Sequence, residues 1–170
     1  MINHLPDRLD LSAAAETGRV LRGRVELTRL VRALPQLESP EGELEVSLEL
    51  GRDEDGTRYL AGSIQGSLVL LCQRCLKPLE YPLDVTFRLG LVHGQEQMQG
   101  LSDRYEPLLV TGEPASLAEI ITDEVLLALP IVPLHSRTST CRPPAMDCKT
   151  PAGSRRESPF DMLAQLKQKS

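Results

Sequence analysis

The sequence is poor in aromatic side chains. Its 170 residues include three tyrosines, two phenylalanines and no tryptophan. Proteins that bind single-stranded nucleic acid by stacking on its bases need several exposed rings on one surface. The shortage of rings therefore excludes the commonest RNA-binding modules and any function that depends on a platform of stacked bases.

Long apolar runs and export signals are also missing. The longest stretch without charged or hydrogen-bonding side chains covers residues 125–134, and it is interrupted by Pro130 and Pro133. A spanning helix needs ~20 apolar residues, about twice that length. The first seven residues show neither the basic and apolar pattern of a secretory signal nor the Arg-rich pattern of a transit peptide. We therefore expect a cytoplasmic protein with no membrane partner.

The sequence has none of the common short enzyme motifs. It lacks the G-x-S-x-G nucleophile elbow, the G-x-x-x-x-G-K-[ST] phosphate loop, the G-x-G-x-x-G dinucleotide motif and the H-E-x-x-H metalloprotease motif. The three histidines, His4, His93 and His135, have no nucleophile near them in the sequence. We interpret each as a surface histidine and predict no catalytic residues, so the protein is not expected to be an enzyme.

Charge is present but unevenly distributed. The net charge is -5, yet residues 1–134 hold 12 basic and 21 acidic side chains, whereas residues 135–170 hold 7 basic and 3 acidic ones. A basic appendage on an acidic body can contact a polyanion locally, in a way that added salt weakens. A solvated surface is the simpler explanation for any single cluster of these charges.

Apolar and polar residues alternate at 19–28, 43–50 and 81–91, which is typical of half-buried strands. Residues 58–71 are predicted to form a further long strand, in which Gly62 and Gly66 suggest a bend or bulge. Short loops join the last three of these four strands. Successive strands joined by short loops usually pair antiparallel. The predicted fold is α+β, an antiparallel β meander or partly closed sheet with a packed helix after the last strand and a flexible C-terminal arm.

Residues 105–110 are predicted to form a last short strand, and a helix is predicted after it. Ser116 and Glu119 form a capping box, and Pro130 ends the helix that follows. Helical spacing predicts a buried stripe of Leu117, Ile120, Ile121, Leu127 and Ala128, with Asp123 and Glu124 facing water. The segment 131–134 is then expected to run back over the core.

The chain divides into three predicted regions. Residues 1–134 form a single α+β domain, residues 135–159 form a flexible basic arm rich in proline and serine, and residues 160–170 form a short C-terminal helix. That helix has one narrow apolar stripe, which we predict to be a partner-binding element composed of Phe160, Leu163 and Leu166.

The four cysteines suggest a metal site. Cys72 and Cys75 are separated by two residues in a turn between strands, so both thiolates could bind one Zn²⁺ ion. Cys141 and Cys148 form a second, wider pair, so the candidate ligand set is Cys72, Cys75, Cys141 and Cys148. The alternative is that the first pair is merely reduced and partly buried. A redox dithiol would need a helix N-terminus, which is not expected here.

Four motifs together resemble the YceD family, known as large ribosomal RNA subunit accumulation proteins. They are the Cys-x-x-Cys-Leu turn at residues 72–76, Tyr105-Glu106-Pro107, the run from Asp123 to Pro133, and Ser158-Pro159-Phe160-Asp161 with the residues up to Lys167. The resemblance extends from about residue 19 to the end. It implies a non-enzymatic role in the synthesis, processing or stability of large-subunit (23S) ribosomal RNA during ribosome biogenesis.

The implied partners are ribosomal RNA or a large-subunit precursor, and a ribosomal protein. Candidate phosphate contacts are the arginines on the predicted strand, in the cysteine turn and in the arm, namely Arg22, Arg24, Arg74, Arg155 and Arg156. The alternative hypothesis is a protein-interaction module with a structural zinc site and no direct contact with RNA.

Overall fold

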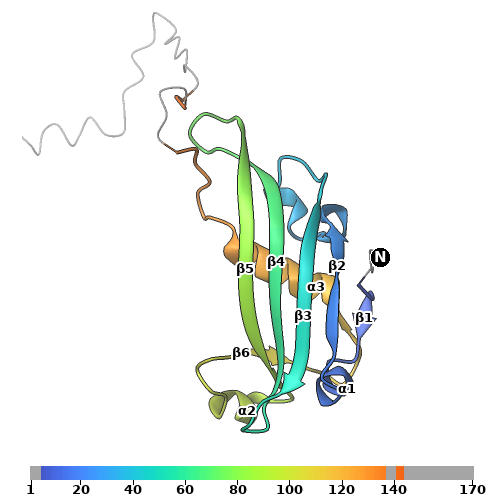
Figure 1. Cartoon of the computed structure of the whole chain (residues 1–170). Helices are drawn as coiled ribbons and strands as arrows, with labels where there is room; N and C mark the ends of the chain where they lie inside the picture. Colours follow the sequence, from blue (N-terminus) through green and yellow to red (C-terminus); the bar gives the residue numbers. More distant parts are fainter. Residues whose placement is uncertain (1–4, 137–140, 144–170) are drawn as a thin grey trace, which may run out of the picture.

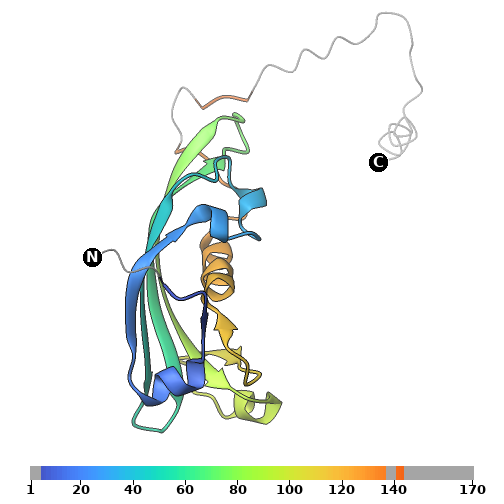
Figure 2. The same cartoon turned by 90° about the vertical axis from the view of Figure 1, so that its right-hand side faces the viewer.

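The computed structural model describes residues 5–136 and 141–143, and it confirms the α+β class (Figure 1). A five-stranded sheet is covered on one face by a helix and by the N-terminal segment (Figure 2). The elements in chain order are β1 (Arg8–Leu9), α1 (Leu11–Glu16), β2 (Val20–Glu26), the 3-10 helices η1 (Leu27–Arg29) and η2 (Leu34–Gln36), β3 (Glu43–Arg52), β4 (Arg58–Leu71), β5 (Pro78–Val92), α2 (Gln95–Gln99), β6 (Glu106–Leu109), β7 (Ala115–Ser116) and α3 (Leu117–Ala128).

The sheet has the strand order β2-β3-β4-β5-β6, and its first four strands form the predicted antiparallel meander. The fifth strand differs, because β6 pairs with β5 in parallel. Residues 93–105, which include α2, form a crossover connection of the length that parallel pairing requires. The sheet is open rather than closed, with β2 at one edge and β6 at the other.

The core lies on the face of the sheet that curves around α3 (Figure 2). In β3 the predicted alternation is confirmed, since Leu44, Val46, Leu48 and Leu50 are buried there. On β4, Gly62 makes room for the ring of Phe87, because a Cβ atom at that position would lie 2.2 Å from a ring carbon. The long strands therefore pack closely without many aromatic residues.

Helix α3 begins with the expected cap, in which the Glu119 backbone N–H donates to Ser116 Oγ at 3.4 Å. The predicted buried stripe was wrong at two positions. Glu124 is only 8% exposed, whereas Leu127 is 74% exposed. Side chains at helical spacings of three and four residues from Leu117 and Ile121 share one face, which includes position 124 and leaves position 127 out. Burial therefore follows helical geometry rather than hydrophobicity at these positions.

The expectation for residues 131–134 was also wrong. Ile131 is fully exposed and Val132 is 54% exposed, so this segment does not cover the core. Pro130 and Pro133 lack the backbone N–H groups that regular strand pairing needs. The segment instead runs toward the turn between β4 and β5. The longest described helix, α3, has 12 residues, and none of the described helices could cross a lipid bilayer.

Candidate metal centre

The turn between β4 and β5 positions the first two candidate ligands. The backbone N–H of Cys72 donates to the Lys77 carbonyl at 3.0 Å, and that of Leu76 donates to the Cys72 carbonyl at 2.9 Å. Leu76 has a φ of 54°, a left-handed conformation that is uncommon for a leucine. The turn thereby directs the side chains of Cys72 and Cys75 to the same side, where both are buried.

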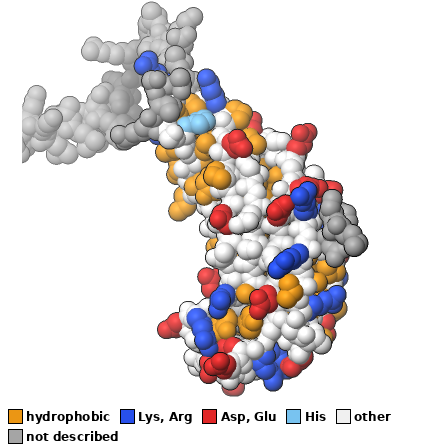
Figure 3. Space-filling view, in the orientation of Figure 1, with side chains coloured by type: hydrophobic (Ala, Val, Ile, Leu, Met, Phe, Trp, Pro, Cys, Tyr) orange, Lys and Arg blue, Asp and Glu red, His pale blue; other side chains and the backbone are white. Residues whose placement is uncertain are grey.

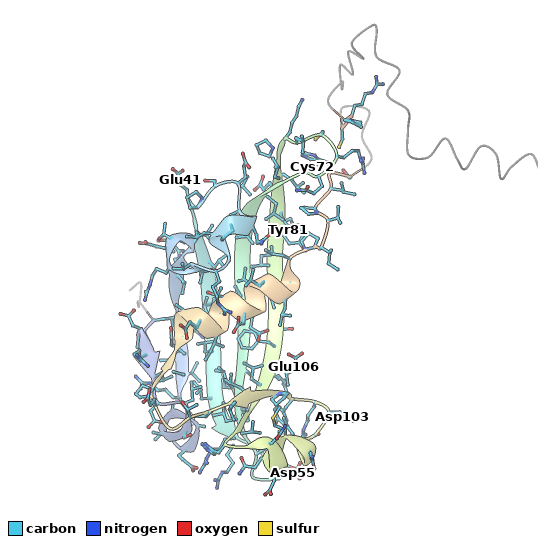
Figure 4. The ribbon with its side chains drawn as sticks, turned by 180° about the vertical axis from the view of Figure 1, so that it is seen from behind. Glu41, Asp55, Cys72, Tyr81, Asp103 and Glu106 are labelled. Atoms are coloured by element: carbon cyan, nitrogen blue, oxygen red, sulfur yellow. The ribbon has the colours of Figure 1, made fainter. Side chains whose placement is uncertain are left out.

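The segment after α3 supplies two further ligands to the same place. Pro130 follows the end of α3, and the Gln73 backbone N–H then donates to the Pro133 carbonyl at 2.9 Å. This contact holds the segment against the hairpin, beside the labelled Cys72 (Figure 4). His135 and Cys141 consequently lie next to the Cys72–Cys75 turn, although 60 residues separate Cys75 from His135.

The four side chains form a compact cluster of three sulfurs and one nitrogen. Their ligand atoms all lie within 4.8 Å of one another. The distance from Cys72 Sγ to Cys141 Sγ is 3.8 Å, and His135 Nδ1 lies 3.4 Å from Cys75 Sγ and 3.8 Å from Cys141 Sγ. Ligands of a tetrahedral zinc ion are about 3.8 Å apart for two sulfurs and about 3.6 Å apart for sulfur and nitrogen. The cluster could therefore hold a metal ion.

The imidazole of His135 is oriented for this role. Its Nε2 lies 3.1 Å from the carbonyl oxygen of Pro78, which can only accept a hydrogen bond. Nε2 therefore carries the proton, and the lone pair of Nδ1 faces the three thiols. Metal-binding histidines are usually fixed in this way by a second hydrogen bond to a carbonyl or carboxylate.

The surroundings of the thiols favour one thiolate. Burial alone would raise the pKa of Cys72, but backbone N–H groups of Cys75, His135 and Arg74 lower this pKa to about 5. Burial raises the pKa of Cys141, as do the neighbouring Cys75 and Cys72. Three thiols this close cannot all ionise without a cation between them. A metal ion would supply that charge.

The structure thus brings together three of the four predicted ligands and adds His135 to them. Cys72, Cys75 and Cys141 lie together, whereas Cys148 lies outside the described residues. His135, interpreted above as a surface histidine, is the ligand that sequence reasoning missed. A histidine six residues before a cysteine was the available signal, but only the path of the chain after Pro130 shows that it reaches the Cys72–Cys75 turn.

The predicted RNA-contacting arginines fall into different environments. Arg74 lies beside the cluster of three cysteines and His135, with its Nη1 3.7 Å from Cys141 Sγ. Arg24 forms ion pairs with Glu43 at 3.6 Å and Glu45 at 2.9 Å. Arg22 makes no ion pair within the described residues. Arg155 and Arg156 lie outside those residues, as do the predicted partner-binding residues Phe160, Leu163 and Leu166.

Most arginines of the body are matched by carboxylates. Figure 3 shows acidic and basic side chains interspersed over the helix-free face of the sheet. Within the described residues, the arginines in ion pairs are Arg24, Arg29, Arg32, Arg52, Arg58 and Arg104. Arginines bound in this way are less available for phosphate. Arg22, which has no such partner there, is the better candidate on the sheet.

Comparison with known proteins gives one family. Residues 60–167 match the family described as "Large ribosomal RNA subunit accumulation protein YceD". A Haemophilus influenzae protein with the same description is 31% identical over 150 residues, covering 85% of this chain and 83% of that protein. No solved structure matches.

Proposed function

The chain belongs to the YceD family, and from this premise we propose that it acts in the accumulation of large-subunit (23S) ribosomal RNA during ribosome biogenesis. Its contribution is non-enzymatic and takes place in the cytoplasm. The observation that carries this proposal is the family match, which spans both the cysteine turn and the C-terminal segment. The name of the Haemophilus influenzae relative supports the same role.

We propose zinc as the metal ion that the four-residue cluster binds. Three thiolates and one imidazole are a donor set that zinc prefers, and the distances between the ligand atoms suit a tetrahedral site. With four protein ligands, the site has no open position for a substrate, so bound zinc would have a structural role. Cys72 and Cys75 would hold one side of the ion, and His135 and Cys141 the other. The site would then fix where the basic C-terminal segment leaves the sheet.

Contacts with RNA are proposed for the arginines. Across the helix-free face of the sheet, the strand register aligns Arg22 with Ser47, Ser63 and Thr86 in one row. Hydroxyl and guanidinium groups are common phosphate contacts, and such contacts position RNA without reading its sequence. Arg74 beside the metal cluster and the arm residues Arg155 and Arg156 complete the proposed contacts.

Binding to a large-subunit RNA fragment as salt is raised tests these contacts. We expect the logarithm of affinity to fall linearly with the logarithm of salt concentration. Arg22→Gln is expected to lower the steepness of this dependence by about one unit. Arg24→Gln is the matched control, since Arg24 is already occupied by two glutamates. Equal effects of the two changes would contradict a role for Arg22.

A second candidate is a protein-interaction module with a structural zinc site and no direct contact with RNA. The extensive pairing of the body arginines favours it, because paired arginines leave little positive surface. A ribosomal protein is the partner in this version, and Phe160, Leu163 and Leu166 are the docking residues. Sedimentation with large-subunit precursors that survives raised salt, together with no RNA cross-links, would favour this candidate over the first.

A further inference from the structure

Glu124 is unusual among the charged side chains of this protein. It is 8% exposed, and within the described residues it is the only charged side chain that is buried. No hydrogen bond or ion pair reaches its carboxylate from the described part of the chain. Its side chain is mostly buried, and its carboxylate opens into a cleft rather than being sealed in the core. A mostly buried charge is costly unless it is paired. The described residues supply no cationic partner for this one.

This carboxylate lines a cleft of about 330 Å³ between α3, β5 and the start of β6. Glu106 and Asp103 also line the cleft, and Figure 4 shows both of them below α3. Of the two arginines at the cleft, Arg104 is bound to Asp53 at 3.1 Å and Asp55 at 2.6 Å. Arg88 makes no ion pair within the described residues, and one cation cannot balance these carboxylates.

The pKa of Glu124 agrees with the geometry. Burial raises this pKa above its ordinary value, and the negative charges of Glu106 on β6 and Asp123 on α3 raise it further. Asp123 itself is paired with Arg32. A cation placed in the cleft would remove the cost of ionising Glu124.

The cleft opens beside an accessible edge of the sheet. Strand β6 pairs with β5 only from Leu89 to Val92, so the rest of β5, from Pro78 to Arg88, has no second neighbouring strand among the described elements. Leu127, on the rim of the cleft, is 74% exposed. An extended chain could therefore approach along β5, and the stem of a long side chain could pack on Leu127.

We propose that this cleft binds a lysine or arginine side chain on an extended segment of a partner protein, with Glu124 and Glu106 accepting its hydrogen bonds. The charge of the cleft selects this occupant, since carboxylates repel a nucleic acid and attract a basic peptide. The inference goes beyond the proposed function, because it holds whether or not the arginines elsewhere contact RNA.

The test uses the full chain and two synthetic peptides. One peptide alternates valine and arginine, and the other carries citrulline, the neutral analogue, in place of each arginine. We expect the arginine peptide to bind and to shift the backbone amide signals of residues 85–88, 103–106 and 124–128 in NMR spectra. The citrulline peptide is expected to leave these signals unchanged.

Two variants locate the binding. Glu124→Gln keeps the size of the side chain and is expected to weaken binding of the arginine peptide by about thirtyfold or more, as for removal of one partner of a buried charged pair. Glu96→Gln removes one exposed charge from α2, outside the cleft, and is expected to change affinity less than about twofold. Equal effects of the two substitutions would overturn the proposal.

Three other results would also overturn it. The first is equal binding of the arginine and citrulline peptides. The second is binding that appears only after Arg155→Glu and Arg156→Glu are introduced together, which would identify the chain's own basic segment as the occupant. The third is the same set of amide shifts with Mg²⁺ alone, which would make the cleft a metal-ion site.

Discussion

The Cys72–Cys75–His135–Cys141 cluster and the Glu124 cleft differ in whether their buried polar groups have partners. At the cluster, the four ligand atoms lie within 4.8 Å of one another. The proton on His135 Nε2 is donated to the Pro78 carbonyl. At the cleft, Glu124 is buried without a partner from the described chain. Buried polar groups are normally hydrogen-bonded. In our proposals, the cluster serves the protein's own structure, whereas the cleft serves a group from outside.

The largest expected effect comes from breaking the cluster. Cys75→Ser removes one ligand and is expected to reduce bound metal from one equivalent to well under one, measured by elemental analysis of protein purified under reducing conditions. The signals of residues 131–136 and 141 are then expected to change in NMR spectra, while those of the β3 core stay in place. Loss of the whole fold would contradict this picture, because the core lies away from the turn.

The identity of the fourth ligand gives the next effect. His135→Ala is expected to weaken metal binding strongly, and His135→Cys to restore it, because a fourth thiolate also completes a tetrahedral site. Cys148→Ser is the matched control and is expected to leave metal content unchanged. If Cys148→Ser removed the metal and His135→Ala did not, Cys148 rather than His135 would be the fourth ligand.

A smaller effect, of opposite sign, is expected at the cleft. Glu124→Gln should raise the free energy of unfolding at pH 7 by about 1 kcal/mol, because it removes an unpaired buried charge. The pKa of Glu124 is raised in the folded state, so folding binds a proton and the ionised carboxylate destabilises the protein. This penalty is absent below the unfolded pKa and grows as the pH rises toward the folded one.

Denaturant unfolding of both proteins across this pH range checks the prediction. The two stability curves are expected to converge at low pH, where Glu124 is protonated in both folded and unfolded states. They should separate as the pH rises. A variant that is less stable than the parent protein at pH 7 would show that Glu124 is stabilised by its surroundings, and the comparison with the metal cluster would fail.

The smallest effect is expected at an exposed ion pair. Arg24→Gln removes contacts with Glu43 and Glu45, but all three side chains are about half exposed or more. Exposed pairs contribute about 0 to 1 kcal/mol. We expect a loss below about 1 kcal/mol in thermal or denaturant unfolding, and a loss that shrinks as salt is added. A larger loss would mean that the charges on the sheet help to hold the fold.

The local elements could largely be predicted from sequence, whereas the positions of distant residues could not. Alternation located β3, and the capping box located the start of α3. The parallel pairing of β6 depends on a crossover that has no periodic signal. The burial of Glu124 was missed because hydrophobicity was given more weight than helical spacing. His135 was missed because its distance from Cys75 depends on where the chain runs after Pro130.

X-ray absorption spectroscopy of the purified, metal-bound protein tests the central claim most directly. The account predicts one zinc ion with three sulfur ligands at about 2.3 Å and one nitrogen ligand at about 2.0 Å. Four sulfur ligands would place Cys148 in the site instead of His135. Protein that holds no metal under reducing conditions would contradict the proposal that zinc fixes the C-terminal segment to the sheet.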